Sequence, residues 1–389
     1  MNELCKRVCD AVDEMEGLLG SVSAEIFEYP EVKFEEVRAS KRLADELEKG
    51  GFRVERGVAG LKTAIRAVHP AEQEGPRVAI LGEYDALPEI GHACGHNLIA
   101  AAALGASLAV GAVKEELPGT LLFFGTPAEE GGGGKVVMID AGLFDGVDAA
   151  MMFHPSTDTM VDRGSLAITE VKIEFAGRPA HASASPEKGI NALDAVIQTF
   201  NGINALRQHL KDDARIHGII TDGGAKPNIV PEHAAAEFYV RARANDDRDE
   251  LLNKVRRCAE GAALATGAKL TFREVGHAYK AMKPNRILGG LFTRHLESLG
   301  EPLRPPKGNA LGSTDMGDVS QLVPAIHAYI KICEDDVAGH SREFAEASAS
   351  ERGRRAMLIA AKAMAMTAVD VLTDTELVAR MWEEFRDTP

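Results

Sequence analysis

Five acidic or imidazole side chains stand directly after short apolar runs: Glu83, Asp85, Glu129, Glu130 and His154. The apolar runs are residues 78–81, 121–124 and 149–153, and each has the composition of a buried strand. In open α/β sheets the ligand site lies beyond the carboxyl ends of the strands. Three strands that end in acids or histidine therefore predict one shared site.

Residues 91–97, Gly-His-Ala-Cys-Gly-His-Asn, bring a thiol and two imidazoles together just ahead of a predicted helix. Cysteine and histidine suit zinc-like ions, so the segment predicts half of a metal site. The alternatives are an exposed loop with a buried free cysteine, and a nucleophilic Cys94, since a helix N-terminus lowers a thiol pKa. The acids at the strand ends would raise that pKa instead, which favours the metal site over the nucleophile.

The run from Glu129 to Lys135, Glu-Glu-Gly-Gly-Gly-Gly-Lys, does not fit a phosphate-binding loop. That loop needs glycine where Glu129 stands and serine or threonine where Val136 stands. Paired acids are better explained beside a cation, where one ligates and its neighbour holds a water as general base. An acidic loop that caps a helix is the structural alternative.

Two further histidines depend on their neighbours for any role. His340 precedes a predicted helix with Ser341 as its N-cap, and alone it is more simply a structural residue. His181 lies in a loop of the inserted domain that we predict over residues 168–283. His181 joins the cluster at the strand ends only if the inserted domain, of its own subunit or of a partner subunit, folds over the site. A solvent-exposed loop histidine is the alternative.

Other polar groups could contact a substrate. Asn228 and Arg241 in the inserted module could bind a carboxylate or an oxyanion. Backbone amides of the turn-rich segment 312–318, which includes Gly312 and Ser313, could hold a substrate carboxylate. A plain surface turn explains the composition of that segment equally well.

The first part of the chain alternates apolar strands with helical patterns, such as residues 98–113, as in a sheet covered on both sides. From about residue 168 the pattern changes to strands in which apolar and polar residues alternate with period two. The predicted strands are 171–175, 216–221, 236–241 and 269–275, with helices over 190–210 and 248–266. The order β-α-β-β-α-β is the split-βαβ, ferredoxin-like arrangement. Such a module has one uncovered sheet face, which favours a homodimer.

After residue 284 the pattern of apolar strands and helices seen in the first part of the chain returns. We predict a helix near 287–299, an irregular stretch over 302–317, a strand over 325–332 and a helix over 350–372. The sequence therefore predicts an α/β fold in which a mixed sheet is flanked by helices and interrupted by an α+β lid or dimerisation domain. We expect the metal-binding domain to comprise residues 1–167 and 284–389, and the lid to comprise residues 168–283.

Composition narrows the class of protein. The 389 residues carry a formal net charge of −15, which disfavours nucleic-acid partners. Residues 1–19 are typical of an amphipathic helix without a signal-peptide core, and no uninterrupted apolar run approaches the ~20 residues that cross a bilayer. Five scattered cysteines do not resemble a disulfide framework. We expect a cytoplasmic protein with neither a membrane nor a nucleic-acid partner.

With these segments in this order, the chain resembles the M20 family of metallopeptidases and amidohydrolases over essentially its whole length. The resemblance is greatest to the branch of p-aminobenzoyl-glutamate hydrolases, aminoacylase-like enzymes and β-alanyl-dipeptide hydrolases. The segments that carry it are residues 82–88, 91–97, 127–133, 153–155, 177–182 and 312–318.

The resemblance implies a site with two divalent metal ions per subunit, Zn²⁺ or Mn²⁺, whose ligands are Cys94, His96, Glu130, His154 and His340. It implies that Glu129 is the general base and that Asp85 orients a histidine ligand. It also implies that His181 reaches the site of the partner subunit in a homodimer and steadies an oxyanion. Asn228 and Arg241 are implied as substrate contacts.

The implied reaction is hydrolysis of an amide bond in a small N-acyl or N-aminoacyl amino acid with a carboxylate, by a metal-activated water. Asn97 departs from the auxin-conjugate branch, which has aspartate there, and favours the p-aminobenzoyl-glutamate and dipeptide branch. Cys94 stands where other M20 enzymes have a bridging aspartate, which leaves the metal open. The alternatives are hydrolysis of a non-peptide C–N bond and a non-catalytic metal-binding paralogue.

Overall fold

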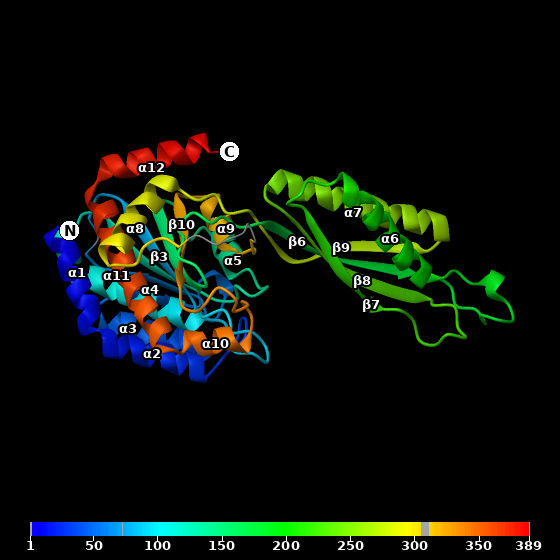
Figure 1. Cartoon of the computed structure of the whole chain (residues 1–389), viewed down its shortest axis with the longest axis horizontal. Coiled ribbons are helices and arrows are strands. Elements are labelled where there is room, and N and C mark those ends of the chain that lie inside the picture. Colours follow the sequence, from blue (N-terminus) through cyan, green and yellow to red (C-terminus); the bar gives the residue numbers. More distant parts are fainter. Residues whose placement is uncertain (1, 72, 305–310, 389) are drawn as a thin grey trace. The chain divides into compact units, whose positions relative to one another are not determined.

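The computed structural model describes residues 2–71, 73–304 and 311–388, and the chain divides into two compact units (Figure 1). Unit 1 comprises Met1–Gly164, Met282–Leu311 and Asp315–Pro389. Unit 2 comprises Ser165–Ala281 and Gly312–Thr314. Residues 305–310 of the irregular stretch predicted at 302–317 lie outside the described residues.

Unit 1 is built on a mixed sheet that is flanked by helices, as the sequence predicts. In spatial order, its strands within the described residues are β1 (Arg53–Arg56), β2 (Ile65–Val68), β4 (Thr120–Thr126), β3 (Arg77–Glu83), β5 (Ala149–Ser156) and β10 (Ala325–Lys331). Neighbouring strands from β4 to β10 are parallel, whereas β2 is antiparallel to both of its neighbours, β1 and β4. The parallel strands β3 and β4 are buried along nearly their whole length, which explains why they are continuously apolar.

The helices of unit 1 come from three parts of the chain. They are α1 (Glu3–Glu14), α2 (Glu16–Glu28), α3 (Val37–Lys49), α4 (His96–Gly111), α5 (Gly134–Asp140), α8 (Arg286–Ser298), α9 (Met316–Ser320), α10 (Arg342–Ser348), α11 (Glu351–Thr373) and α12 (Thr375–Asp387). The single helix expected over residues 1–19 is two helices, because the backbone leaves helical geometry at Met15 (φ −90°, ψ 3°).

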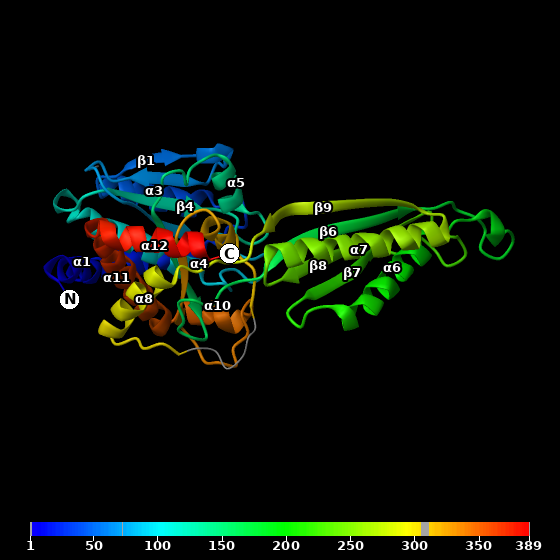
Figure 2. The same cartoon turned by 90° about the horizontal axis from the view of Figure 1, so that it is seen from above.

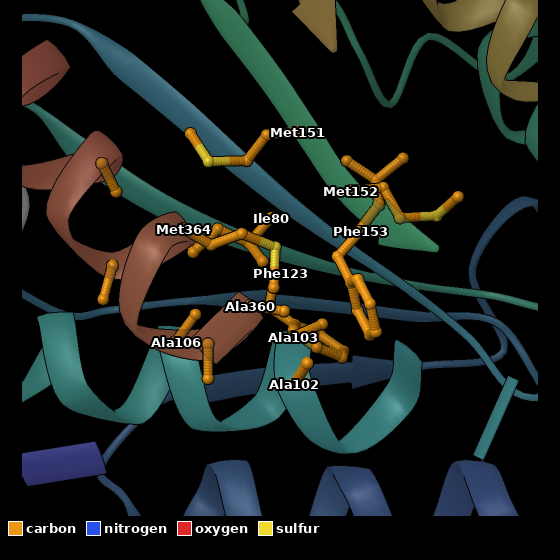
Figure 3. Packing of buried hydrophobic residues seen from close by; sticks show 14 of the residues in the cluster. Ile80, Ala102, Ala103, Ala106, Phe123, Met151, Met152, Phe153, Ala360 and Met364 are labelled. Atoms are coloured by element: carbon orange, nitrogen blue, oxygen red, sulfur yellow. The ribbon is translucent and has the colours of Figure 1, made fainter. Parts of the chain in front are cut away.

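The core of unit 1 lies where α4 and α11 pack on the sheet. Helix α4 is buried around most of its circumference, which suits its alanine-rich sequence because small side chains let neighbouring elements approach closely. Figure 3 shows residues of α4, α11 and strands β3, β4 and β5 meeting in this core: Ala102, Ala103, Ala106, Ala360, Met364, Ile80, Phe123, Met151, Met152 and Phe153.

Helix α11 is long and apolar enough to cross a bilayer, which the count of uninterrupted apolar runs did not anticipate. However, 78% of its apolar window is buried inside the structure, where it packs on α4 and α8. A core helix meets the same criteria of length and composition. Packing in unit 1 therefore accounts for its apolar composition, and the absence of a membrane partner stays a prediction.

Unit 2 has the predicted β-α-β-β-α-β order. Its elements are β6 (Ala167–Ala176), α6 (Ala192–Leu206), β7 (Arg215–Asp222), β8 (His233–Ala242), α7 (Asn245–Thr266) and β9 (Lys269–Tyr279). The antiparallel sheet has the order β7-β8-β6-β9, and α6 and α7 pack against each other and against β6 and β8 (Figure 2). Alternate residues of β6, including Val171, Ile173 and Phe175, are buried, as expected for a sheet with one covered face.

Candidate metal centre

The turn between β3 and α4 delivers two donors to the carboxyl ends of the parallel strands. Cys94 lies in this turn and His96 is the first residue of α4. Gly95 between them has φ +76°, and a Cβ on it would lie 2.4 Å from Cγ of Pro155 on β5. Glycine is therefore required at this position both for the left-handed backbone and for the close approach to β5.

Cys94 belongs to two groups of side chains that could each hold a metal ion. In one group it lies with His96 and His154, and in the other with Glu130 and His340, with all ligand atoms of a group within 4.8 Å of one another. Its Sγ lies 3.2 Å from Nε2 of His340 and 3.8 Å from Nε2 of His154. Two three-donor groups that share one sulfur could together hold two metal ions.

The buried His96 and the half-buried His154 turn the same ring nitrogen, Nε2, towards the cluster. Nδ1 of His96 donates to the backbone carbonyl of Asp85 (2.8 Å) and lies 3.1 Å from its carboxylate, and Nδ1 of His154 donates to the carbonyl of Pro155 (2.7 Å). These bonds put the proton on Nδ1 and leave Nε2 free to ligate. Asp85 thus lies within hydrogen-bonding distance of His96, and its role in orienting a metal ligand stays a prediction.

The donor atoms of the cluster fit a cation. Nε2 of His96 and Oε1 of Glu130 are buried and have no hydrogen-bond partner among the described residues. Buried polar atoms are normally paired, and these two unpaired atoms belong to one group of possible metal ligands, which indicates a ligand between them. Sulfur, imidazole and carboxylate donors together suit zinc and manganese.

The loop that carries His340 is held in a strained conformation. His340 has φ +58°, a left-handed conformation that is uncommon outside glycine and concentrates at functional sites. Its backbone N–H donates to the carbonyl of Ala93 (3.2 Å), which fixes this loop beside Cys94. Ser341 accepts from the N–H of Phe344 and caps α10, as the sequence predicts.

Glu129 belongs to two groups of side chains, one with candidate metal ligands and one with other acids. The first group contains His96 and Glu130, and the second contains Glu83 and Asp315. Burial of its carboxyl group, together with the nearby carboxylates, raises the pKa of Glu129 well above its usual value. A carboxylate with a raised pKa accepts a proton more readily, as a general base must.

The acids beside Glu129 are joined by one buried cation. Nζ of Lys135 contacts Glu83 and lies 2.7 Å from Oδ1 of Asp315, and all three side chains are fully buried. The Lys135 N–H also donates to Asp315 (3.0 Å). Asp315 and Glu83 outweigh the effect of burial and raise the pKa of Lys135, so the lysine is charged. Lys135 stands in a segment that resembles a phosphate loop only in part, and nothing in that pattern predicts this role.

Electrostatics around Cys94 argue against a nucleophilic thiol. Burial, and next the carboxylate of Glu130, raises the pKa of Cys94 well above its usual value. Burial and the neighbouring His96 lower the pKa of His154 to about 3, so this imidazole is neutral and able to ligate. Only a cation at this position would hold the sulfur as a thiolate.

The two other polar residues of the segment 91–97 are structural. Nε2 of His92 lies 3.0 Å from the carbonyl of Ile26 on α2, away from the donor cluster, so the two imidazoles of this segment do not share a site. Nδ2 of Asn97 donates to Oγ of Ser23 (3.0 Å) and more weakly to the carbonyl of Ser348 (3.4 Å). Asn97 therefore ties α4 to α2 and α10.

Two predicted residues lie together in one loop region of unit 2. Nδ1 of the exposed His181 accepts hydrogen bonds from the N–H groups of Ser183 (3.4 Å) and Ala184 (3.3 Å), so the ring proton belongs on Nε2. Asn228 is exposed, and its carbonyl accepts from the N–H of Ala182 (3.0 Å). This region presents an N–H donor that is suited to an oxyanion.

The remaining predicted residues of unit 2 also meet. Nη1 of Arg241 on β8 lies 3.4 Å from Oγ of Ser313, and the carbonyl of Gly312 accepts from the N–H of Leu166 (2.8 Å). Nε of Arg241 is buried and has no hydrogen-bond partner among the described residues. Burial lowers the pKa of Arg241, but a guanidinium remains charged and is suited to a carboxylate ligand.

Comparison with known proteins places these features in one family. The family model of peptidase family M20/M25/M40 matches residues 79–363. The chain is 38% identical to the Xaa-Arg dipeptidase of Mus musculus (98% of this chain, 92% of the relative). It is 30% identical to a p-aminobenzoyl-glutamate hydrolase subunit of Escherichia coli (99% and 95%). A dinuclear metal binding peptidase of the M20 family from Bacillus subtilis has a similar fold, with a TM-score of 0.73 at 22% identity over 92% of this chain and 99% of that one.

Proposed function

The chain belongs to peptidase family M20/M25/M40, whose members are metallopeptidases and amidohydrolases, and from this premise we propose that it hydrolyses dipeptides or N-acyl amino acids that carry a free carboxylate. The observation that carries the proposal is the cluster in which two metal-binding groups share Cys94 beside Glu129. A protein that only binds metal needs no proton acceptor beside the ions, whereas a hydrolase does.

Two divalent ions are the proposed occupants of the cluster. Cys94, His96 and His154 would hold one ion, and Cys94, Glu130 and His340 would hold the other. The thiolate favours Zn²⁺, while the carboxylate and the imidazoles also suit Mn²⁺. Divalent cations in such a site supply Lewis acidity toward the scissile carbonyl and lower the pKa of a water molecule.

Glu129 is the proposed general base. It would take a proton from the attacking water and pass that proton to the leaving amine, so that one carboxyl group serves both halves of the reaction. Its raised pKa supports this role, because a base must bind the proton long enough to transfer it. Asp85 would hold His96 in the tautomer that ligates.

The residues of unit 2 would bind the substrate. Arg241, with Ser313 and Gly312 beside it, is the proposed partner of the substrate carboxylate. Asn228 lies beside His181 at the other end of β8, so it would contact a substrate together with His181. His181 of a partner subunit would donate its Nε2–H to the oxyanion. One such donor typically contributes about 3 kcal/mol to the stability of a transition state.

Dipeptides are the proposed substrate class because the relative at 38% identity is an Xaa-Arg dipeptidase. The test measures amine release from Xaa-Arg and β-alanyl dipeptides, p-aminobenzoyl-glutamate, N-acetyl amino acids and an anilide without a carboxylate. Each is tested with chelator, and with added Zn²⁺ or Mn²⁺. Metal-dependent release from a carboxylate-bearing class supports the proposal. If no substrate releases amine although both ions are bound, the proposal is overturned, and a non-peptide C–N substrate or a non-catalytic protein is favoured.

The variant Glu129→Gln serves as the control for the base. It keeps the shape of the side chain but cannot accept the proton, so we expect unchanged metal content and thermal stability with most of the turnover lost, by roughly 10²–10⁴-fold. Turnover close to that of the unchanged protein would contradict the role of Glu129 and leave the metal ligands untouched.

A further inference from the structure

Glu36 is a fully buried acid far from the metal ligands in sequence, and it contacts the segment that carries Glu129. It precedes α3, and its side chain is 0% exposed. Oε1 accepts hydrogen bonds from the N–H groups of Phe34 (2.8 Å) and Ala128 (2.9 Å), and Oε2 accepts from Oγ1 of Thr63 (2.7 Å). The contact to Ala128 joins the N-terminal segment to the residue directly before Glu129.

Ala128 has a backbone conformation that needs support. Its φ is +59°, in the left-handed region that residues other than glycine rarely adopt, and the residue is fully buried. The turn that follows is wound tightly on it: the N–H of Gly132 donates to its carbonyl (3.0 Å), and a Cβ on Gly132 would lie 2.5 Å from the Cβ of Ala128. Such strain persists only where surrounding contacts hold it.

Two buried carboxylates hold the backbone on either side of Glu129. Glu36 binds the N–H of Ala128, and Oδ2 of Asp85 accepts from the N–H of Glu130 (2.9 Å). Asp85 also orients His96. The residue between these two amides is the one whose carboxyl group must reach the reacting water, so its direction depends on both carboxylates.

We propose that Glu36 is a positioning residue of the hydrolytic site, which holds Ala128 in its left-handed conformation and so directs Glu129, and the ligand Glu130 after it, toward the metal-binding donors. The inference rests on the proposed role of Glu129. Glu36 acts through hydrogen-bond geometry, so the length of its side chain and the acceptor at Oε1 matter, whereas its charge does not.

The first comparison separates geometry from charge. Glu36→Gln keeps a carbonyl oxygen for both amides, and its NH₂ can donate to the Thr63 hydroxyl, so we expect kcat within about threefold of the unchanged protein. Glu36→Asp keeps the charge but is one methylene shorter, and Glu36→Ala has no acceptor. Both should lower kcat by about 10–100-fold with KM within twofold. Thr63→Val, which leaves both amide bonds in place, is the matched control and should retain kcat.

The second comparison tests the backbone directly. Glycine adopts left-handed φ without a steric penalty, so Ala128→Gly in the Glu36→Ala background should raise kcat at least threefold over Glu36→Ala alone. A loss of stability elsewhere would not be repaired by this change. Affinity for Zn²⁺, measured by competition with a chelator, should fall about tenfold in Glu36→Ala through the displaced Glu130 and recover in the double variant.

Each outcome has a defined meaning. An inactive unchanged protein would overturn the proposed function, while the Zn²⁺ affinities would still test the inference. If Glu36→Gln fails like Glu36→Ala, or if Ala128→Gly restores neither kcat nor Zn²⁺ affinity, the positioning role is wrong. If Glu36→Ala does not fold, folded Glu36→Asp with unchanged kcat would also contradict it.

Discussion

Lys135 is the cation between two buried acids of the site, Glu83 and Asp315. Lys135→Met would leave both carboxylates buried without their partner, which typically destabilises a protein by about 3–5 kcal/mol. We expect a loss of this size in the free energy of unfolding measured with urea. The control is Lys41→Met, which breaks the exposed pair with Asp45 and should change stability by less than about 1 kcal/mol. Equal effects of the two variants would show that the buried ion pairs do not stabilise the fold.

His92 makes stability depend on pH. Burial, and next the neighbouring His96, lowers the pKa of His92 from its ordinary value of 6.5, which holds in the unfolded chain, to about 4 in the folded protein. Between these values the unfolded chain binds a proton that the folded chain does not, so stability falls as the pH falls from 6.5 to 4.

We expect the metal-free protein to lose about 1.5 kcal/mol more stability between pH 6.5 and pH 5 than the variant His92→Gln, which cannot titrate. Urea unfolding of both proteins, treated with chelator and measured across this range, checks the difference. Parallel curves for the two proteins would mean that His92 is not buried in the neutral form.

At the scale of elements, the packing of α2 on α4 distinguishes two helical glycines. Gly17 on α2 is exposed, and a Cβ added to it would have nothing within 4 Å, so Gly17→Ala should stabilise the protein by about 0.5–1 kcal/mol. A Cβ on Gly105 of α4 would lie 2.6 Å from Cδ1 of Leu19 on α2, so Gly105→Ala should destabilise it by about 1–3 kcal/mol. Thermal unfolding of the two variants should shift in opposite directions; a shift in the same direction would contradict the packing.

Elements with a clear period were predictable from the sequence, and contacts between distant residues were not. The apolar runs that became β3, β4 and β5 show continuous burial in their composition, and the alternation in β6 shows one covered face. The break at Met15 has no such signal, because the chain is helical directly before and directly after it.

The candidate site divides in the same way. Donors such as Glu130 and His154 stand at or directly after the carboxyl ends of strands, where the sheet brings them together whatever the detail of the loops. Lys135 and Glu36 act through a buried ion pair and through backbone amides, which leave no spacing rule in the sequence. The glycines that follow Glu130 do not fit a phosphate loop, and a Cβ on Gly134 would lie 1.9 Å from the carbonyl oxygen of Pro127, so close backbone contact explains at least this one.

At the scale of the whole molecule, the proposed homodimer predicts that two inactive variants can repair each other. In a mixed dimer of His181→Ala and Glu129→Ala subunits, one of the two sites would have both residues if His181 acts across the interface. A one-to-one mixture with free exchange should regain about a quarter of the activity of the unchanged protein. Activity assays before and after exchange check this. No recovery, with mixed dimers demonstrated, would contradict the action of His181 in the partner's site.

The interruption of unit 1 by unit 2 sets an order of events during synthesis on the ribosome. The core of unit 2 is drawn from a continuous stretch, from Val171 to Phe272, whereas α11, which packs on α4 and β5, is made near the end of the chain. Domains generally fold as units while the chain emerges from its N-terminus. Unit 2 can therefore close its core first, while β3, β4 and β5 wait for β10 and α11 with apolar surface uncovered. During that interval the nascent chain exposes the most apolar surface to which a chaperone can bind.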